Sequence, residues 1–262
     1  VTLRLGSNSA GSINYTSVNS NFVTVGSTLI FQYKDGAVYG TNSNRVFNVV
    51  RVEPLTAAGG SDEVSFDLDT VVNILYVGSG SKFDMAYVAG TVLTKLNVNN
   101  NLTIDGTFVV SGGTLVALGA VGIGTSTVID ASGARYGNLQ FENALQLPSG
   151  SILKAGNDII QSTSADKNLG FTVNGGSLTL NGTILKYLNT NGITVTDTHW
   201  LSITSANFRN QQSQGMALRI LHPGTSQYTF AVCDFDGNTT TNVYVSNIVA
   251  PGYVKMSSAT GA

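Results

Sequence analysis

The sequence predicts an all-β protein whose larger part is a right-handed parallel β-helix, a β-solenoid in which each coil adds one short strand to each stacked sheet. The first observation is a repeat of apolar, strand-like segments whose steps are 25, 24, 25, 23, 19 and 23 residues, marked by Ile104, Ile129, Leu153, Leu178, Leu201, Ile220 and Val243. A period of about 20 to 25 residues with strand chemistry is typical of one solenoid coil.

Composition is the second observation that favours β structure. Charged residues make up only 11% of the chain, against about 25% in an average soluble domain. Lys and Glu, which are good helix formers, are scarce, whereas Val, Thr, Ile, Tyr and Phe are abundant. The net charge is −2 and no run of Lys or Arg occurs, so we expect no nucleic-acid partner.

The first 90 residues differ from the rest and predict a β-sandwich or a β-cap in front of the solenoid. Their longer apolar segments predict strands at 23–25, 28–33, 45–52, 64–68 and 71–77. Turn residues at 34–36 and 78–81 predict hairpins between such strands. A solenoid needs a cap, because its first coil otherwise exposes a row of unpaired backbone groups.

Residues 91–262 carry the short strands of the β-helix. Strands are expected at 102–104, 108–110, 114–116, 178–180, 193–195, 201–203 and 243–245. Turns are expected at 105–106, 112–113, 174–176, 181–182 and 191–192, and loops leaving the coil at 165–168 and 210–215. The uncharged stretch 106–129 is interrupted by Gly, Ser and Thr, which predicts buried β-coils and no membrane span.

The segment 189–208, NTNGITVTDTHWLSITSANF, resembles a coil of the pectin-lyase-like right-handed parallel β-helix superfamily, closest to polygalacturonase-type glycoside hydrolases. Asn189, Thr190, Gly192 and Ile193 match the motif of these enzymes, but Asn191 occupies the position of the catalytic Asp. The paired Asp and the Gly-His-Gly motif are absent, and Arg219-Ile220-Leu221 is a partial echo of Arg-Ile-Lys. Because an amide cannot act as a general acid, the resemblance implies the fold without the activity.

Residues 102–118, LTIDGTFVVSGGTLVAL, are similar in composition to the β-helical passenger regions of secreted bacterial surface proteins. The chain begins with Val rather than Met, which is consistent with a processed mature form. The single cysteine, Cys233, lies in an apolar run, and we interpret it as a buried thiol. These features favour an extracellular or cell-surface location.

Asp234, Asp236 and Asn238 resemble the start of a calcium-binding loop, because oxygen ligands alternate before and after a Gly turn. The Glu expected at the end of such a loop is replaced by Val245, so the alternative is a solenoid turn with two solvated carboxylates. A second group, Asp62, Glu63, Asp67 and Asp69, is either a cation bridge or a solvated strand face. No other cofactor is expected.

His199 and Trp200 form the candidate carbohydrate-binding site, with Asp197 nearby. An exposed Trp beside polar groups can stack on a sugar ring, whereas the alternative is a Trp packed at a coil corner beside a surface His. We found no nucleophile elbow, phosphate-binding loop or dinucleotide fingerprint.

The sequence therefore predicts a secreted, non-enzymatic structural protein of a cell-surface layer, an extracellular filament or an adhesin stalk. Its expected partner is itself, as a homo-oligomer or polymer joined through β-rich contacts, because a surface with few charges is cheap to desolvate. Surface polysaccharide is a second expected partner. The alternative function is a carbohydrate-binding or degenerate carbohydrate-cleaving β-helix, similar to a lyase or a tailspike.

Overall fold

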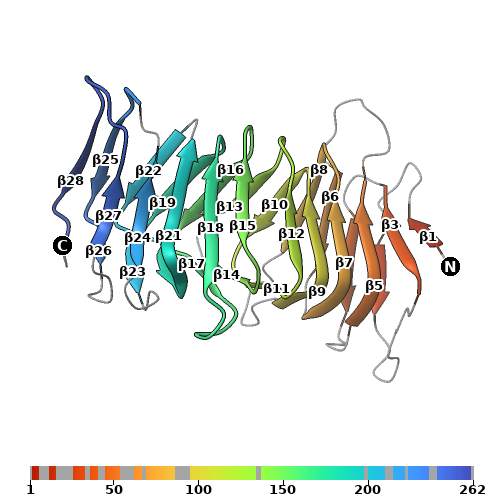
Figure 1. Cartoon of the computed structure of the whole chain (residues 1–262). Coiled ribbons are helices and arrows are strands. Elements are labelled where there is room, and N and C mark those ends of the chain that lie inside the picture. The colour runs from red at the N-terminus through yellow and green to blue at the C-terminus, as the bar shows by residue number, and fades with distance from the viewer. Residues whose placement is uncertain are drawn as a thin grey trace. The chain divides into compact units, whose positions relative to one another are not determined.

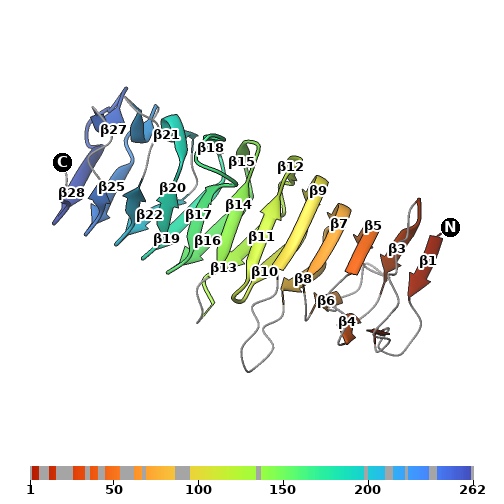
Figure 2. The same ribbon diagram turned by 90° about the horizontal axis from the view of Figure 1, so that it is seen from below.

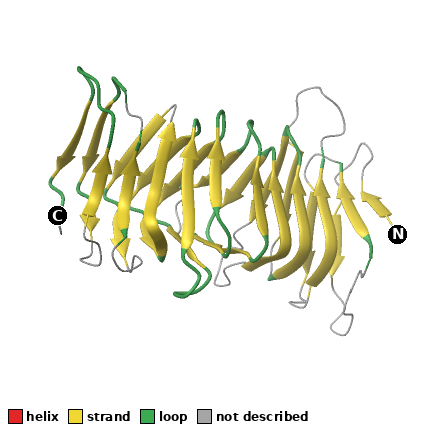
Figure 3. Cartoon of the chain, viewed as in Figure 1, coloured by secondary structure: helices red, strands yellow, loops and turns green. Residues whose placement is uncertain are grey.

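The structure is a computed structural model, and the chain forms two compact units, Val1–Gly137 and Asn138–Ala262. Strands and the loops between them make up all of the described residues, none of which is helical (Figure 3). The described residues are 2–5, 12–15, 26–32, 36–40, 45–53, 62–66, 69–85, 95–133, 137–197, 200–209, 215–221, 224–235 and 241–260.

Each coil of the first unit passes through two parallel sheets. One sheet has the order β1 (Thr2–Leu5), β3 (Thr28–Phe31), β5 (Arg45–Val52), β7 (Thr70–Val77), β9 (Lys95–Ile104) and β11 (Thr114–Ala117), with β12 (Ala120–Ile123) also paired with β9. The other has the order β2 (Ser12–Tyr15), β4 (Gly36–Gly40), β6 (Asp62–Phe66), β8 (Ser81–Met85), β10 (Thr107–Val110) and β13 (Val128–Ala131). Successive strands in the chain alternate between the sheets, except that β11 and β12 both lie in the first sheet (Figure 2).

The core of the first unit contains a column of buried phenylalanines. The ring centroids of Phe66 and Phe83 are 5.0 Å apart, and those of Phe83 and Phe108 are 5.2 Å apart. Phe47 reaches Phe66 from the opposite sheet at 6.0 Å. Inward residues alternate with outward ones along β8 and β10, as a strand with one buried face requires.

An asparagine ladder, Asn48, Asn73 and Asn100, links three coils of the first unit. The side-chain amide of Asn73 donates to Oδ1 of Asn48 at 3.2 Å, and that of Asn100 donates to Oδ1 of Asn73. Asn48 continues the ladder by donating to the carbonyl of Ser27. Each side-chain amide is a hydrogen-bond partner for the next, so these polar side chains connect neighbouring coils along the stacking direction.

Each coil of the second unit passes through three parallel sheets. The first sheet contains β14 (Asn138–Phe141), β17 (Ile159–Ser162), β20 (Ile184–Lys186), β23 (Asn207–Arg209) and β26 (Asp234–Phe235). The second contains β15 (Leu145–Pro148), β18 (Leu169–Asn174), β21 (Leu188–Asp197), β24 (Met216–Ile220) and β27 (Thr241–Val245), which lie side by side in Figure 1. The third contains β16 (Ile152–Gly156), β19 (Ser177–Asn181), β22 (Trp200–Thr204), β25 (Gln227–Ala231) and β28 (Tyr253–Ser257).

A stacked column of corners connects the third sheet of each coil to the first sheet of the next. The corner residue has a positive φ at every level: Asn157, Gly182, Ser205, Val232 and Ser258. The backbone N–H of each of the first four corner residues donates to the next coil, as from Ser205 to the carbonyl of Ala231 at 2.8 Å. The residues after the first four corners are buried, and Cys233 is one of these, as predicted. Burial raises the pKa of the Cys233 thiol, so it stays protonated and inert at neutral pH.

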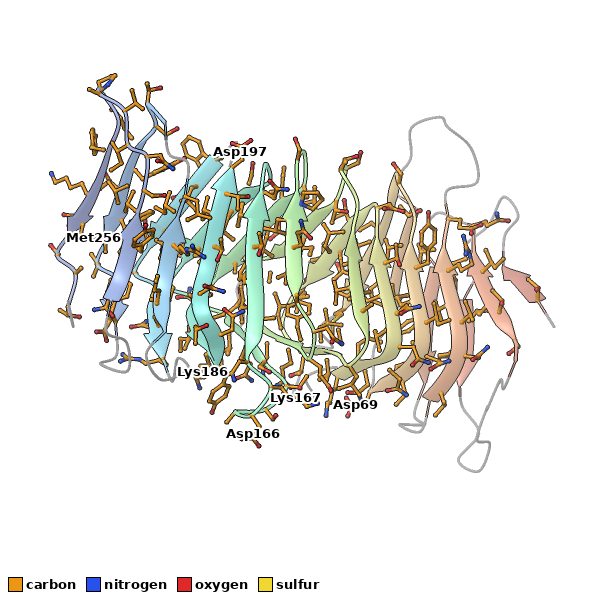
Figure 4. The ribbon with its side chains drawn as sticks, in the orientation of Figure 1. Asp69, Asp166, Lys167, Lys186, Asp197 and Met256 are labelled. Carbon is orange, nitrogen blue, oxygen red and sulfur yellow. The ribbon has the colours of Figure 1, made fainter. Side chains whose placement is uncertain are left out.

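The predicted strands are largely confirmed. Residues 45–52 form β5, and 102–104, 108–110, 114–116, 178–180, 193–195, 201–203 and 243–245 all lie within strands. The stretch 106–129 forms β10 to β12 and the start of β13, so β-coils occur there as predicted. The predicted burial is wrong for β12, which alternates between exposed and half-buried residues. The loop expected at 165–168 also occurs, and Asp166 and Lys167 lie on it (Figure 4). The strand at 23–25, the turn residues 34–35 and loop residues 210–214 lie outside the described residues.

Two predictions at turns are wrong, and one irregular spacing has a structural explanation. The turn at 78–81 is a corner between β7 and β8, which belong to different sheets, and not a hairpin. Asn191-Gly192 lies inside β21, where the register shifts between Leu169 and Phe171 of β18, so it forms a bulge and not a corner. The irregular 19-residue step arises because Leu201 and Ile220 lie on different sheets, β22 and β24.

The described strands of residues 1–90 form parallel ladders that continue into β9, so the region builds solenoid coils itself rather than paired hairpins. The predicted domain division into 1–90 and 91–262 stays a prediction. No helix among the described residues is long and apolar enough to cross a membrane.

Candidate functional site

The segment that resembles the polygalacturonase motif forms the bulge in β21. Oδ1 of Asn189 accepts a hydrogen bond from the backbone N–H of Asn191 at 3.0 Å, which closes a tight local turn. Gly192 follows with φ of +59°, and a Cβ atom there would lie 2.3 Å from the carbonyl oxygens of Met216 and Ala217. Only glycine fits this close approach between β21 and β24.

The bulge brings Asn191 next to Arg219. In the resemblance to polygalacturonases, Asn191 occupies the position of the catalytic Asp, and Arg219 that of the Arg in the Arg-Ile-Lys motif. Nη1 of Arg219 donates to Oδ1 of Asn191 at 3.3 Å. The guanidinium lies 5.9 Å from the ring centroid of Tyr244. Nε of Arg219 is buried without a hydrogen-bond partner among the described residues. An amide and a guanidinium can bind polar groups here, but neither can deliver a proton at neutral pH.

Asp234, the first residue of the calcium candidate, is engaged within the protein. Its carboxylate accepts a hydrogen bond from Oγ1 of Thr260 at 2.7 Å and pairs with Nη2 of Arg209. The hydrogen bond from Thr260 and the Arg209 guanidinium hold the pKa of Asp234 below its ordinary value. The other two candidate ligands, Asp236 and Asn238, lie outside the described residues, so calcium binding stays a prediction.

The second acidic group is described only in part. Asp69 accepts a hydrogen bond at Oδ1 from the backbone N–H of Lys95, 2.9 Å away, and so holds the start of β9. Asp62 and Glu63 lie in β6, and Asp67 lies outside the described residues. Across the described part of the chain, no group of three or more His, Cys, Asp and Glu side chains is placed to share a metal ion.

Trp200, the carbohydrate-binding candidate, begins β22 and is 62% exposed. Its neighbour Leu201 points inward, so the tryptophan lies on the outward face of the sheet rather than packed in a corner. His199 lies outside the described residues, and Asp197 ends β21 on a different sheet (Figure 4). The structure therefore supplies an exposed aromatic ring on a sheet face without showing the partner His.

Sequence reasoning missed the exposed apolar residues of the last coil. Tyr244, Ile248, Val249 and Tyr253 are all exposed and fall within ten residues. Alternation along the strand could have found Tyr244, because it sits between the inward positions Val243 and Val245. The corner residues Ile248 and Val249 carry no such signal, because corners have no fixed inward or outward alternation.

A polar cluster on the first unit was also missed. The Arg51 guanidinium lies 4.4 Å from the ring centroid of Tyr76 and pairs with the carboxylate of Glu53. Burial and the negative charge of Asp105 raise the pKa of the Tyr76 hydroxyl. Arg51 and Tyr76 are 25 positions apart in the sequence, and Tyr76 and Asp105 are 29 positions apart. They meet because they lie at equivalent places on neighbouring coils. The cluster joins neighbouring coils of the first unit.

Comparisons with protein-family models, with curated proteins and with solved structures gave no match. The fold therefore defines the class of this protein, a parallel β-solenoid.

Proposed function

We propose that the protein is a secreted, non-catalytic structural element of a cell-surface layer, extracellular filament or adhesin stalk, and that its copies associate through β-rich contacts. The observation that carries this proposal is the exposed apolar surface on the coil formed by β26, β27 and β28, where Tyr244, Ile248, Val249 and Tyr253 are all exposed. In an earlier coil, the inward residues Leu178 and Leu180 of β19 are fully buried. The inward residues of β28, Val254 and Met256, are only half-buried.

The surroundings of this coil also favour protein contact over hydration. Ile248 is 46% exposed and Val249 is 57% exposed, beside Tyr253 and Tyr244. Residues 241–260 contain a single charged side chain, Lys255. Contiguous exposed apolar surface with little charge marks interaction sites, because its burial requires the desolvation of few charged groups.

An added β-coil is the partner that fits this surface. A strand edge offers backbone donors and acceptors in a row, and strand addition satisfies them while it buries the inward side chains below. A second copy of the chain carries coils of the same parallel type. We propose that one copy stacks a coil on β26, β27 and β28 of the next, and a contact of this kind between two different surfaces propagates into filaments.

We further propose that the chain is a catalytically inactive relative of the pectin-lyase-like superfamily. The parallel coils and the segment 189–208 support this assignment, and Asn191 in place of the catalytic Asp supports inactivity. Absence of turnover on polygalacturonate, with Asn191→Asp as a matched variant, is the expected result.

Sedimentation velocity across a concentration series tests self-association. The wild-type protein is expected to form larger species as its concentration rises. The double variant Ile248→Lys, Val249→Lys is expected to stay monomeric, because two lysines place like charges on the contact. Leu118→Lys, a change at an exposed apolar residue of the first unit, is the control and should associate as wild type does. A wild-type protein that stays monomeric at every concentration would contradict the proposal.

Carbohydrate binding is the second proposed function, and the exposure of Trp200 on a sheet face is the observation that favours it. Sugar rings stack on flat aromatic side chains, and the hydroxyl and amide groups around Trp200 can hydrogen-bond to sugar hydroxyls. A screen for binding to a broad set of glycans tests this function, and binding to none of them would overturn it.

A further inference from the structure

Two exposed aromatic residues lie in one row of the third sheet of the second unit, on its outward face. Ser177 of β19 pairs with Trp200 of β22. Thr204 pairs with Ala231 of β25, and Trp200 and Gln227 each lie four residues before this pair on their strands. Gln227 in turn pairs with Tyr253 of β28. We call Ser177, Trp200, Gln227 and Tyr253 the aromatic row.

The two rings of the aromatic row are two strands apart. Neighbouring parallel strands are about 4.8 Å apart, so two strand spacings correspond to about 10 Å along the stacking direction. Trp200 is 62% exposed and Tyr253 is 43% exposed. The aromatic row takes one residue from each strand, so it runs perpendicular to the strands, along the stacking direction of the coils. Figure 2 shows β19, β22, β25 and β28 side by side in this direction.

A second row of the same face carries hydroxyl groups. Thr179 pairs with Ser202, and Thr229 pairs with Lys255. The outward positions of the three central strands, β19, β22 and β25, contain no charged residue. Among β16, β19, β22, β25 and β28, lysines occur only on the first and the last strand, as Lys154 on β16 and Lys255 on β28. The outward positions of these five strands include no carboxylate.

We propose that this face binds an extended, uncharged β-1,4-linked polysaccharide whose chain runs along the aromatic row. In such a glycan successive rings are flipped, so every second ring presents the same side, and a spacing of about 10 Å lets Trp200 and Tyr253 contact alternate rings. The hydroxyl row and Gln227 supply donors and acceptors beside the stacked rings. An uncharged ligand matches the uncharged central strands, because no unpaired charge is buried on binding.

This inference rests on the second proposed function and adds to it the binding face, the class of glycan and the direction of the chain. The protein contains a single tryptophan, so its fluorescence reports directly on this face. Titration of dilute protein with soluble hydroxyethyl cellulose is expected to shift the Trp200 emission to shorter wavelength in a saturable way. Amylose, in which the linkage is α-1,4, is expected to give no shift, because its chain coils and does not present alternate rings in a line.

Variants separate the aromatic row from other exposed rings. Tyr253→Ala keeps the Trp200 reporter and is expected to weaken binding about tenfold through the loss of one stacking contact. Tyr244→Ala removes an equally exposed ring from the second sheet and is expected to leave the affinity unchanged. Trp200→Ala, followed by affinity electrophoresis in a gel containing the same polymer, is expected to abolish retardation.

Several results would overturn the inference. Equal binding of amylose and hydroxyethyl cellulose, binding of carboxymethyl cellulose alone, or unchanged affinity in Tyr253→Ala would each show that this face does not read an extended neutral glycan. Glycan binding that survives both Trp200→Ala and Tyr253→Ala overturns this face but leaves carbohydrate binding as a function. No binding of any glycan overturns both.

Discussion

The two units of the chain build parallel coils in different ways. Coils of the first unit pass through two sheets, enclose a column of phenylalanines and are linked outside by the asparagine ladder. Coils of the second unit pass through three sheets around a core richer in Leu and Ile. The described residues other than glycine with a positive φ all lie in the second unit: Asn157, Tyr187, Ser205, Val232, Asn247 and Ser258.

This difference indicates that the number of sheets per coil determines where unfavourable backbone conformations are concentrated. A third sheet requires additional corners, and a sharp corner is made by a residue in the left-handed region, which costs about 1 kcal/mol or more outside glycine. In the second unit this unfavourable conformation occurs at the same corner of successive coils, and backbone hydrogen bonds between the stacked corners offset it. The first unit instead relies on ring packing and on side-chain amides.

Removal of a ring from the phenylalanine column is expected to have the largest effect. Phe83 is fully buried between Phe66 and Phe108, so Phe83→Ala should lower the free energy of unfolding by about 4 kcal/mol. Leu180→Ala, the matched change in the second unit, should cost about 3 kcal/mol because a smaller side chain is lost. Urea denaturation measures both, and equal losses would remove the energetic distinction between the two cores.

The next largest effect concerns two glycines that both have a positive φ. Gly192→Ala places Cβ against two backbone oxygens of β24 and should cost about 3 kcal/mol. At Gly80, in the first unit, no atom lies within 4 Å of the added Cβ, so Gly80→Ala should cost about 1 kcal/mol from the backbone conformation alone. Thermal unfolding of the two variants checks this order, and a larger loss for Gly80→Ala would contradict it.

A smaller loss is expected when the asparagine ladder is cut. Asn73 both donates to Asn48 and accepts from Asn100, so Asn73→Ala should cost about 2 kcal/mol. Asn99→Ala, at an exposed neighbouring position of β9, is the control and should change stability by less than about 0.5 kcal/mol. Indistinguishable urea midpoints for these two variants would mean that the ladder does not stabilise the first unit.

A gain of stability is expected at one corner of the second unit. Val232 has φ of +54° and its side chain is 57% exposed, so a β-branched residue holds a left-handed conformation without packing in return. Val232→Asn should raise the free energy of unfolding by about 1 kcal/mol. Ser205→Asn at the preceding corner is the comparison, and it should gain less because serine is not β-branched. A loss of stability in Val232→Asn would show that the corner is not strained.

The smallest effect is the pH dependence contributed by Asp234. Its pKa is lowered in the folded protein by Thr260 and Arg209, so its stabilisation is present above the pKa of the unfolded chain, about 3.9, and is lost as the pH falls through the lower folded value. Asp234→Asn removes this dependence. Urea midpoints of both proteins between pH 2 and pH 7, on the order of one measurement per pH unit, should converge at the acidic end. Parallel curves would contradict the assignment.

The sequence predicted the fold class and most strands because inward positions alternate along each strand, as at 178–180 and 201–203. It could not separate a corner from a bulge, since Asn181-Gly182 and Asn191-Gly192 use the same residue types and differ only in what lies beside them. Hairpin and corner turns also share residue types, which is why 78–81 was misassigned. Of the candidate sites, Trp200 was visible as an aromatic at a strand start, whereas its alignment with Tyr253 depends on coil register.

Electron microscopy of the concentrated protein tests the central claim most directly. If the coil of β26, β27 and β28 accepts a coil of another copy, the wild-type chain should form ordered filaments with an axial repeat, and the Ile248→Lys, Val249→Lys variant should not. Dispersed single particles in both preparations would contradict self-assembly and would leave carbohydrate binding as the function that the structure favours.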